Sequence, residues 1–246
     1  EKTAAAVRMV RERYTLTKAS QELPGHIHEA IRKWCGQMMR AHPERAQEIY
    51  NRDHRRNFAF RAFSFDPTWA RHWRAQRLIE ELKANGARQI IDIGTGGVYA
   101  TIFAKAGFEV TAYDHSDECL RQVEMVAAKW GVSDKVKTAL GRAQELPYEE
   151  GTFDGAVLGE ILEHVSDPDK VLAEAYRVLK PGGVVTATTP YGAHHWDPLH
   201  IGPSGGGWDE KSMDVLLAPY KDKIVTRGMV AEEGTEPSCY LFTLRK

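Results

Sequence analysis

The stretch from Ile90 to Gly97 constrains the fold of this chain more than any other part of its sequence. Its apolar residues predict a buried strand that carries Asp92 near its end and runs into a glycine-rich turn. Glycines let the backbone approach a ligand, and a helix that begins near Val98 would direct its first N–H groups at that ligand. Residues 108–114 predict the next strand, whose terminal Asp114 is placed to accept hydrogen bonds from two ribose hydroxyls. The pair predicts a site for a nucleoside-bearing cofactor in an open α/β sheet.

The glycine turn differs from the turn that binds a dinucleotide. That turn follows Gly-x-Gly-x-x-Gly, with small residues on which a pyrophosphate lies, whereas the third position here is Tyr99. Asp92 would also place a negative charge beside the pyrophosphate. A ligand with a cationic ammonium or sulfonium group suits this acid better.

In this form the turn resembles motif I of the class I S-adenosylmethionine-dependent methyltransferases, roughly acid-x-Gly-x-Gly-x-Gly. The third glycine falls on Val98, and a one-residue deletion would bring Gly97 into its place. Residues 139–148 resemble the family's loop against the adenine, with Arg142 where members often carry an acid. The resemblance continues through the fourth and fifth strands, covers about residues 75–246, and implies S-adenosylmethionine as cofactor. It predicts these cofactor-binding residues: Asp92, Gly94, Thr95, Gly96, Gly97, Asp114, His115, Ala143 and Gly159.

The order of predicted elements indicates an α/β fold preceded by a helical region. Residues 2–18, 27–40 and 43–57 have helical periodicity, and a further helix opens at Asp66-Pro67 and ends at Asn85-Gly86. Strands and helices then alternate, which predicts a doubly wound, mostly parallel sheet with helices on both faces. The last two strands, near 223–231 and 238–245, are joined by a segment too short for a crossover helix, so we expect an antiparallel hairpin.

The family resemblance implies seven strands with a reversed last strand. We expect a methyltransferase domain at 67–246, after a helical N-terminal cap at 1–66 that contacts the substrate or a partner. The motif at 177–185 resembles a helix end, a Pro-Gly-Gly turn and the fifth strand.

Acidic and imidazole side chains follow the fourth and fifth strands. Glu160 and Glu163 are three residues apart, so one helical turn would put both carboxylates on the same side, with His164 adjacent. His200 follows the fifth strand. Two carboxylates and two imidazoles predict an octahedral Mg²⁺ or Mn²⁺ site with open positions for substrate oxygens. The pattern resembles the Glu-x-x-Glu-His motif of ubiquinone-pathway O-methyltransferases and small-RNA 3′-terminal 2′-O-methyltransferases, which implies that the metal holds vicinal hydroxyls.

The same segment has a metal-free interpretation. Many metal-free methyltransferases carry a similar Leu-Glu-His-Val segment, in which the glutamate braces the loop and the histidine is a base or a core residue. Glu160 could instead bind the ammonium group of the cofactor, and His195 competes with His200 for the metal. The expected catalytic residues are His164, Glu163 and His195.

Charge is distributed unevenly along the chain. The net charge is −1, with 18 Lys and Arg against 10 Asp and Glu in residues 1–88, and 15 against 24 in residues 89–246. Aromatic residues interleave with arginines between positions 52 and 74. This region is either a surface for an anionic partner such as nucleic acid, or a set of aromatics packed on the catalytic domain beside solvated arginines.

Composition excludes several other classes of protein. No apolar run approaches the ~20 residues of a membrane span, and no signal peptide or lipidation motif is visible. The 3 cysteines are far apart, which argues against a disulfide framework and favours a cytoplasmic protein. The first residue is glutamate, so we expect the chain to be cut from a longer one.

Together these features predict an O-methyltransferase acting on a hydroxylated small molecule such as a sugar, polyketide or phenol. The alternatives are an RNA 2′-O-methyltransferase, which the basic N-terminal half favours, and a cofactor-binding module without catalysis. The sequence does not indicate an oligomeric state.

Overall fold

The computed structural model describes residues 37, 41–42, 45, 47–52, 73–192 and 208–246. The predicted helices over 2–18 and 27–40 fall wholly or largely outside these residues, as do the opening at Asp66-Pro67 and the side chains of His195 and His200. Within them, no helix is both long and apolar enough to cross a membrane. Cys119 and Cys239 are buried and are not joined in a disulfide.

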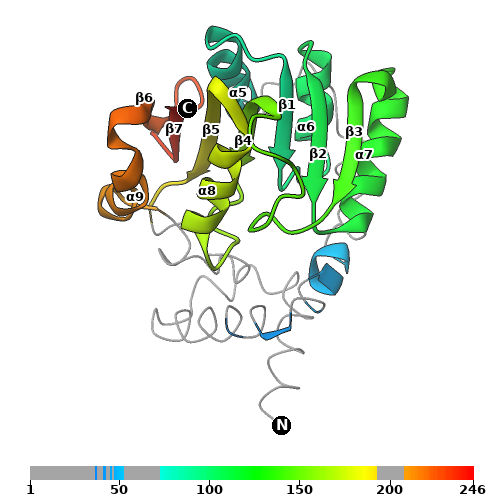
Figure 1. Cartoon of the computed structure of the whole chain (residues 1–246), viewed down its shortest axis with the longest axis horizontal. Helices are drawn as coiled ribbons and strands as arrows, with labels where there is room; N and C mark the ends of the chain where they lie inside the picture. Colours follow the sequence, from blue (N-terminus) through cyan, green and yellow to red (C-terminus); the bar gives the residue numbers. More distant parts are fainter. Residues whose placement is uncertain (1–36, 38–40, 43–44, 46, 53–72, 193–207) are drawn as a thin grey trace.

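A seven-stranded sheet forms the centre of the described structure (Figure 1). Its order is β3-β2-β1-β4-β5-β7-β6, and β7 runs antiparallel to both of its neighbours while the other pairs are parallel. The mostly parallel sheet with a reversed last strand is therefore confirmed. The strands are β1 (Gln89–Ile93), β2 (Glu109–Asp114), β3 (Val136–Leu140), β4 (Phe153–Gly159), β5 (Leu179–Pro190), β6 (Ile224–Val230) and β7 (Cys239–Arg245).

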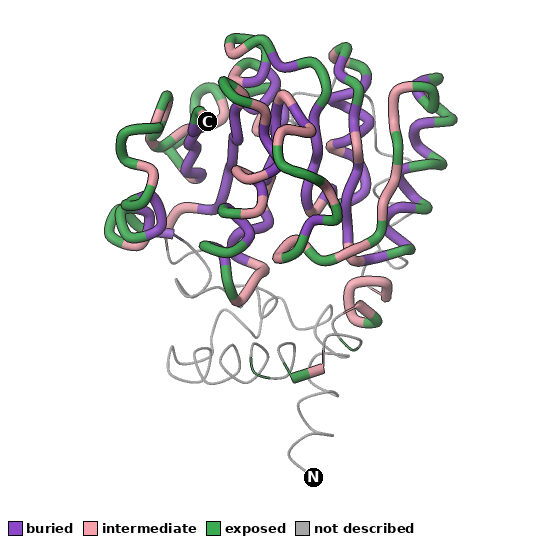
Figure 2. The backbone as a smooth tube through the Cα atoms, in the orientation of Figure 1, coloured by how far each residue is buried: buried purple, intermediate pink, exposed green. Residues whose placement is uncertain are grey.

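Helices cover both faces of the sheet, and Figure 2 shows the buried strands between them. Successive side chains of a strand point to opposite faces, so Ile90 packs with α5, α6 and α7, whereas Ile91 packs with α8 and α9. This explains why the strands are apolar on both sides. The helices are α5 (Trp73–Ala84), α6 (Tyr99–Lys105), α7 (Asp117–Trp130), α8 (Pro168–Arg177) and α9 (Glu210–Leu217), with short 3₁₀ turns at η3 (Ser133–Lys135) and η4 (Ala218–Lys223).

Local signals in the sequence set the helix limits near the site. Helix α6 begins directly after Val98, as predicted, and α5 ends before Asn85-Gly86, where Gly86 has a φ of +73°. Helix α7 begins at Asp117 and is capped by Ser116, whose hydroxyl accepts a hydrogen bond from the Cys119 amide at 3.0 Å. These limits place the amino ends of α6 and α7 at the carboxyl ends of β1 and β2.

The Pro181-Gly182-Gly183 segment differs from its prediction. It lies inside β5, which begins at Leu179, and does not form a turn between helix and strand. The pairing of β4 with β5 shifts register there, and Gly182, with a φ of +81°, donates its amide to Lys246 O at 2.8 Å. Pro181 lacks an N–H for the ladder, and glycine accepts the unusual backbone, so the strand forms a bulge instead of starting later.

Candidate functional site

Asp92 lies at the carboxyl end of β1 and is almost fully enclosed, with 1% of its surface exposed. Neither carboxylate oxygen has a hydrogen-bond partner within the described part of the chain, and the buried hydroxyl of Thr95 also lacks one there. Burial raises the pKa of Asp92 to about 7; the nearby Thr95 hydroxyl lowers it in part, and the charge of Asp114 raises it further. A buried, unsatisfied carboxylate is costly unless a cationic partner completes it.

The turn after β1 consists largely of glycine, so that apart from Thr95 it brings mainly backbone next to Asp92. Gly94, Gly96 and Gly97 have φ angles of +72°, +61° and +93°, in the region that favours glycine. The Gly94 amide donates to Tyr113 O at 2.8 Å, which ties the turn to the end of β2. The predicted glycine cradle is therefore formed, and Val98 closes it as the residue before α6.

Alanine at Gly94 should destabilise the fold more than alanine at Gly86. Both glycines have nearly the same φ, +72° and +73°, so both variants carry the same backbone penalty of about 1–2 kcal/mol. A Cβ on Gly94 would overlap the side chain of Ile161, whereas a Cβ on Gly86 meets nothing within 4 Å. We expect Gly94→Ala to cost a further ~1–3 kcal/mol in chemical denaturation. Equal stability losses in the two variants would show that the contact with Ile161 is loose.

Asp114 ends β2 beside this turn and is also buried. Its Oδ1 accepts the Ser116 amide at 2.9 Å and lies 3.4 Å from His115 Nδ1. In the register of β1 with β2, Asp92 lies opposite Ala112, so the two acids reach the same sheet edge from neighbouring strands. This is the arrangement that the sequence predicted for a ribose-binding carboxylate.

The loop after β3 closes the same side of the turn. Gly141 donates its amide to Asp114 O at 2.9 Å, and Ala143 packs, partly buried, on the core. A Cβ on Gly141 would overlap the Tyr113 hydroxyl, so the loop can approach β2 only with glycine at this position. Arg142 occupies the position where the family often has an acid. Its side chain is exposed, so its charge faces solvent.

A second group of side chains lies at the end of β4 and was not predicted as a unit. Glu160 Oε2 is 3.6 Å from Arg74 Nε, and the Cys239 thiol lies 3.6 Å from Glu160 Oε1. The Nε atom of Arg74 is buried without a hydrogen-bond partner among the described residues. Burial lowers the pKa of Arg74, but the nearby Glu160, Cys239 and Tyr99 together outweigh it and raise the pKa overall.

Tyr99 completes this group from the first turn of α6. A Cβ on Gly159 would lie 2.9 Å from Tyr99 Cδ2, so the absent side chain of Gly159 makes room for the ring. Burial, followed by the charge of Glu160, raises the pKa of the Tyr99 hydroxyl. The helical spacing around Arg74 did not indicate that this residue belongs to the site. The bulk of Tyr99 indicated only that the turn does not bind a dinucleotide.

Glu163 and His164 follow in the turn after β4. Glu163 is enclosed and accepts a hydrogen bond from Thr189 Oγ1 at 3.0 Å; burial and then the charge of Glu160 raise its pKa well above the usual range. His164 Nε2 lies 3.9 Å from Glu163 Oε1, and a quarter of the His164 side chain, 26%, is exposed. A buried acid therefore lies behind a partly exposed imidazole.

The helical turn predicted from the spacing of Glu160 and Glu163 is not formed, although the charge of Glu160 still acts on Glu163. Glu160 has a φ of +58°, which breaks a helix at its first residue, and the segment forms only a tight turn with the His164 amide bonded to Ile161 O. The side chain of Glu160 consequently lies beside Arg74, while Glu163 is enclosed against Thr189.

The predicted Mg²⁺ or Mn²⁺ site is not supported by the described structure. Its residues include no group of three or more His, Cys, Asp or Glu side chains that could hold a metal ion. Of the predicted ligands Glu160, Glu163, His164 and His200, the last lies outside the described residues, as does its competitor His195. Because the two carboxylates already have other partners, we assign no step to a metal.

A family model described as a methyltransferase domain matches residues 91–187, from within β1 to within β5. This stretch contains both strand-end acids, the glycine turn and the turn from Glu160 to His164. This match and the curated relatives support a class I S-adenosylmethionine-dependent methyltransferase.

Relatives of this methyltransferase differ in the atom that they methylate. The chain is 39% identical over 104 residues to a ubiquinone biosynthesis O-methyltransferase of Colwellia psychrerythraea, covering 41% of each chain. It is 37% identical over 110 residues to the ubiquinone/menaquinone biosynthesis C-methyltransferase UbiE of Desulfotalea psychrophila, covering 43% of each chain. The match thus spans less than half the length of either relative, and the family alone does not determine the acceptor atom.

The methyltransferase fold is shared with solved structures of low sequence identity. The structure of the [4+2]-cyclase SpnF is similar with a TM-score of 0.56 and 21% identity, over 69% of this chain and 80% of that one. This likeness concerns the fold, and a fold does not by itself fix the chemistry of its site.

Proposed function

We propose that this protein transfers a methyl group from S-adenosylmethionine to a hydroxyl oxygen of a small molecule. The observation that carries the proposal is Asp92, a fully buried carboxylate whose two oxygens have no partner in the described structure and which adjoins a cradle of bare backbone. A donor with ammonium and sulfonium charges fits such a site, because it supplies the missing counter-charge.

In this proposal, different residues at the sheet edge bind different parts of the donor. Asp92 faces its positive charge, Asp114 with neighbouring His115 binds the ribose hydroxyls, and the backbone near Ala143 lies against the adenine. Thr95 and the turn glycines line the cradle. Arg74, whose Nε has no hydrogen-bond partner among the described residues and lies 3.6 Å from Glu160, is the cation proposed to bind the carboxylate of the donor.

The donor supplies an electrophilic methyl group, so the protein must position the acceptor, remove its proton and exclude water. His164 is the proposed base, because its imidazole is partly exposed and lies 3.9 Å from the enclosed Glu163, which orients it. A hydroxyl acceptor needs such a base. The similarity to a ubiquinone biosynthesis O-methyltransferase supports this choice. We also propose that residues 1–66 form a cap on the methyltransferase domain at 67–246.

Donor binding should strengthen as the pH rises through about 7. The pKa of Asp92 in the free protein is raised to about 7, so its carboxyl group is mostly neutral at pH 6 and mostly ionised at pH 8. A cationic donor requires the ionised form, which predicts a Kd about tenfold lower at pH 8 than at pH 6 by calorimetry. Asp92→Asn should bind weakly with no such slope. The same slope in that variant would assign the pH dependence to a group other than Asp92.

Transfer of labelled methyl groups from S-adenosylmethionine to fractionated cell extract tests the proposed activity. We expect label in the small-molecule fraction, on oxygen, and equal transfer with and without EDTA. Label in RNA, with binding that weakens steeply as salt rises, would contradict the small-molecule acceptor. Donor binding without any transfer would contradict catalysis, and loss of transfer with EDTA would contradict a metal-free base.

A further inference from the structure

A helical segment at residues 47–52 lies near the carboxyl edge of the sheet and contacts residues at the start of α7 that are far from it in sequence (Figure 1). Asn51 makes two hydrogen bonds to the amino end of α7. Its Oδ1 accepts the Ser116 hydroxyl at 2.6 Å, and its Nδ2 donates to Asp117 Oδ1 at 2.6 Å. One side chain thus joins the N-terminal region to the start of the helix that follows the ribose-binding strand.

Ser116 is bonded both to Asn51 and to Asp114. It is buried, its hydroxyl accepts the Cys119 amide at 3.0 Å while donating to Asn51, and its own amide donates to Asp114 Oδ1 at 2.9 Å. The Ser116 hydroxyl therefore both donates and accepts a hydrogen bond, which holds this side chain in one orientation. Ser116 thus links Asn51, through its hydroxyl, to the strand-end carboxylate, through its amide.

Tyr50, the neighbour of Asn51, reaches the other side of the site. Its ring meets the His115 ring edge to face, with centroids 4.6 Å apart and planes at 84°. The His164 ring lies 6.3 Å from it at 82°. Tyr50 thus stands between the residue beside the ribose carboxylate and the proposed base.

We propose that Asn51 is a positioning residue that couples donor binding to docking of residues 47–52. Through Ser116 it fixes Asp114 for the ribose, and the bound donor in turn holds the segment in place, since such coupling is reciprocal. Docking places Tyr50 beside His115 and His164, where its ring lines the acceptor site, so donor binding favours the completed acceptor site. The inference rests on the proposed donor site.

Two measurements with S-adenosylhomocysteine test this coupling. In the wild type, we expect the ligand to slow hydrogen exchange of the amides at 47–52. Asn51→Ala should bind it about tenfold more weakly by calorimetry and lose that protection. Arg52→Ala is the matched control, because Arg52 pairs with Glu48 at 2.9 Å inside the same segment. It should behave as the wild type.

An exchange of partners separates coupling from a general loss of structure. Asn51→Asp puts two carboxylates together and should weaken binding at least as much as Asn51→Ala. Adding Asp117→Asn restores a donor and an acceptor in reversed positions, and should recover affinity and protection. Wild-type binding in Asn51→Ala, or no recovery in the double variant, would overturn the coupling alone. No binding by the wild-type protein would overturn the proposed function and the coupling with it.

Discussion

Replacing Asp114 with alanine is expected to weaken S-adenosylmethionine binding by at least about a hundredfold. The carboxylate at the tip of β2 is placed to accept both ribose hydroxyls, and two hydrogen bonds to a charged group are together worth about 3–6 kcal/mol. The variant also removes the acceptor of the Ser116 amide, which adds to the loss. The measurement is isothermal titration calorimetry on protein whose fold is verified by thermal unfolding.

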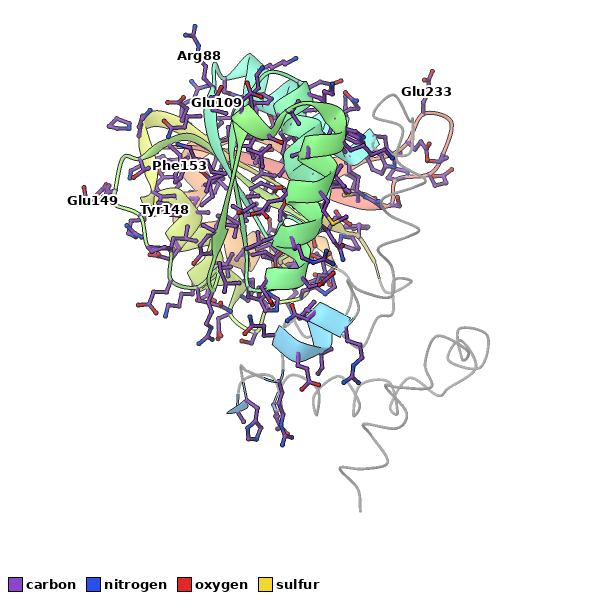
Figure 3. The ribbon with its side chains drawn as sticks, turned by 90° about the vertical axis from the view of Figure 1, so that its right-hand side faces the viewer. Arg88, Glu109, Tyr148, Glu149, Phe153 and Glu233 are labelled. Atoms are coloured by element: carbon purple, nitrogen blue, oxygen red, sulfur yellow. The ribbon has the colours of Figure 1, made fainter. Side chains whose placement is uncertain are left out.

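Glu109→Ala is the control for this variant, because Glu109 is an exposed carboxylate at the other end of the same strand. Figure 3 shows Glu109 beside Arg88, at the end of the sheet away from residues 47–52. The control should bind the donor as the wild type does. Wild-type affinity in Asp114→Ala would contradict the assignment of that carboxylate to the ribose.

His164→Ala is expected to lower kcat by about 10²- to 10⁴-fold while leaving donor affinity within about twofold of wild type. The imidazole is the partly exposed base in the turn after β4, so its loss removes proton transfer without touching the glycine cradle. The readout is labelled methyl transfer to the accepting extract fraction. Ser166→Ala, a hydroxyl in the same loop whose bond is to Asp167, should retain turnover.

Glu163→Ala tests the group behind that base. Glu163 is buried and bonded to Thr189, so donor binding should be spared while turnover is lost as His164 loses its support. Glu163→Gln, which keeps an acceptor for Thr189, should be the more stable of the two and also impaired in turnover. Full turnover in His164→Ala, or in both Glu163 variants, would reassign the base.

The cofactor end of the fold could be predicted because its signals are local. An apolar run ends at an acid and glycines, and the next strand ends at another acid; parallel pairing then brings both ends to one edge. Strand β4 and the hairpin of β6 with β7 were likewise predictable, since their limits coincide with glycines and with a short connection.

The acceptor side could not be predicted, because it depends on contacts between distant residues. The positive φ of Glu160 overrides its helical spacing with Glu163, and Tyr99 fits only because Gly159 lacks a side chain. Asn51 accepts a hydrogen bond from Ser116, which lies 65 residues away in the sequence, and no local pattern indicates such a contact. Pro181 was placed in a turn because its missing N–H excludes helix, but a bulge inside β5 meets the same constraint.

The central claim is that the enclosed Asp92 receives a cationic donor at the end of β1, and calorimetric titration of the wild-type protein with S-adenosylmethionine tests it most directly. The account predicts one binding event per chain with a Kd in the micromolar range at pH 8. Absence of binding heat with the donor at millimolar concentration, from correctly folded protein, would contradict it.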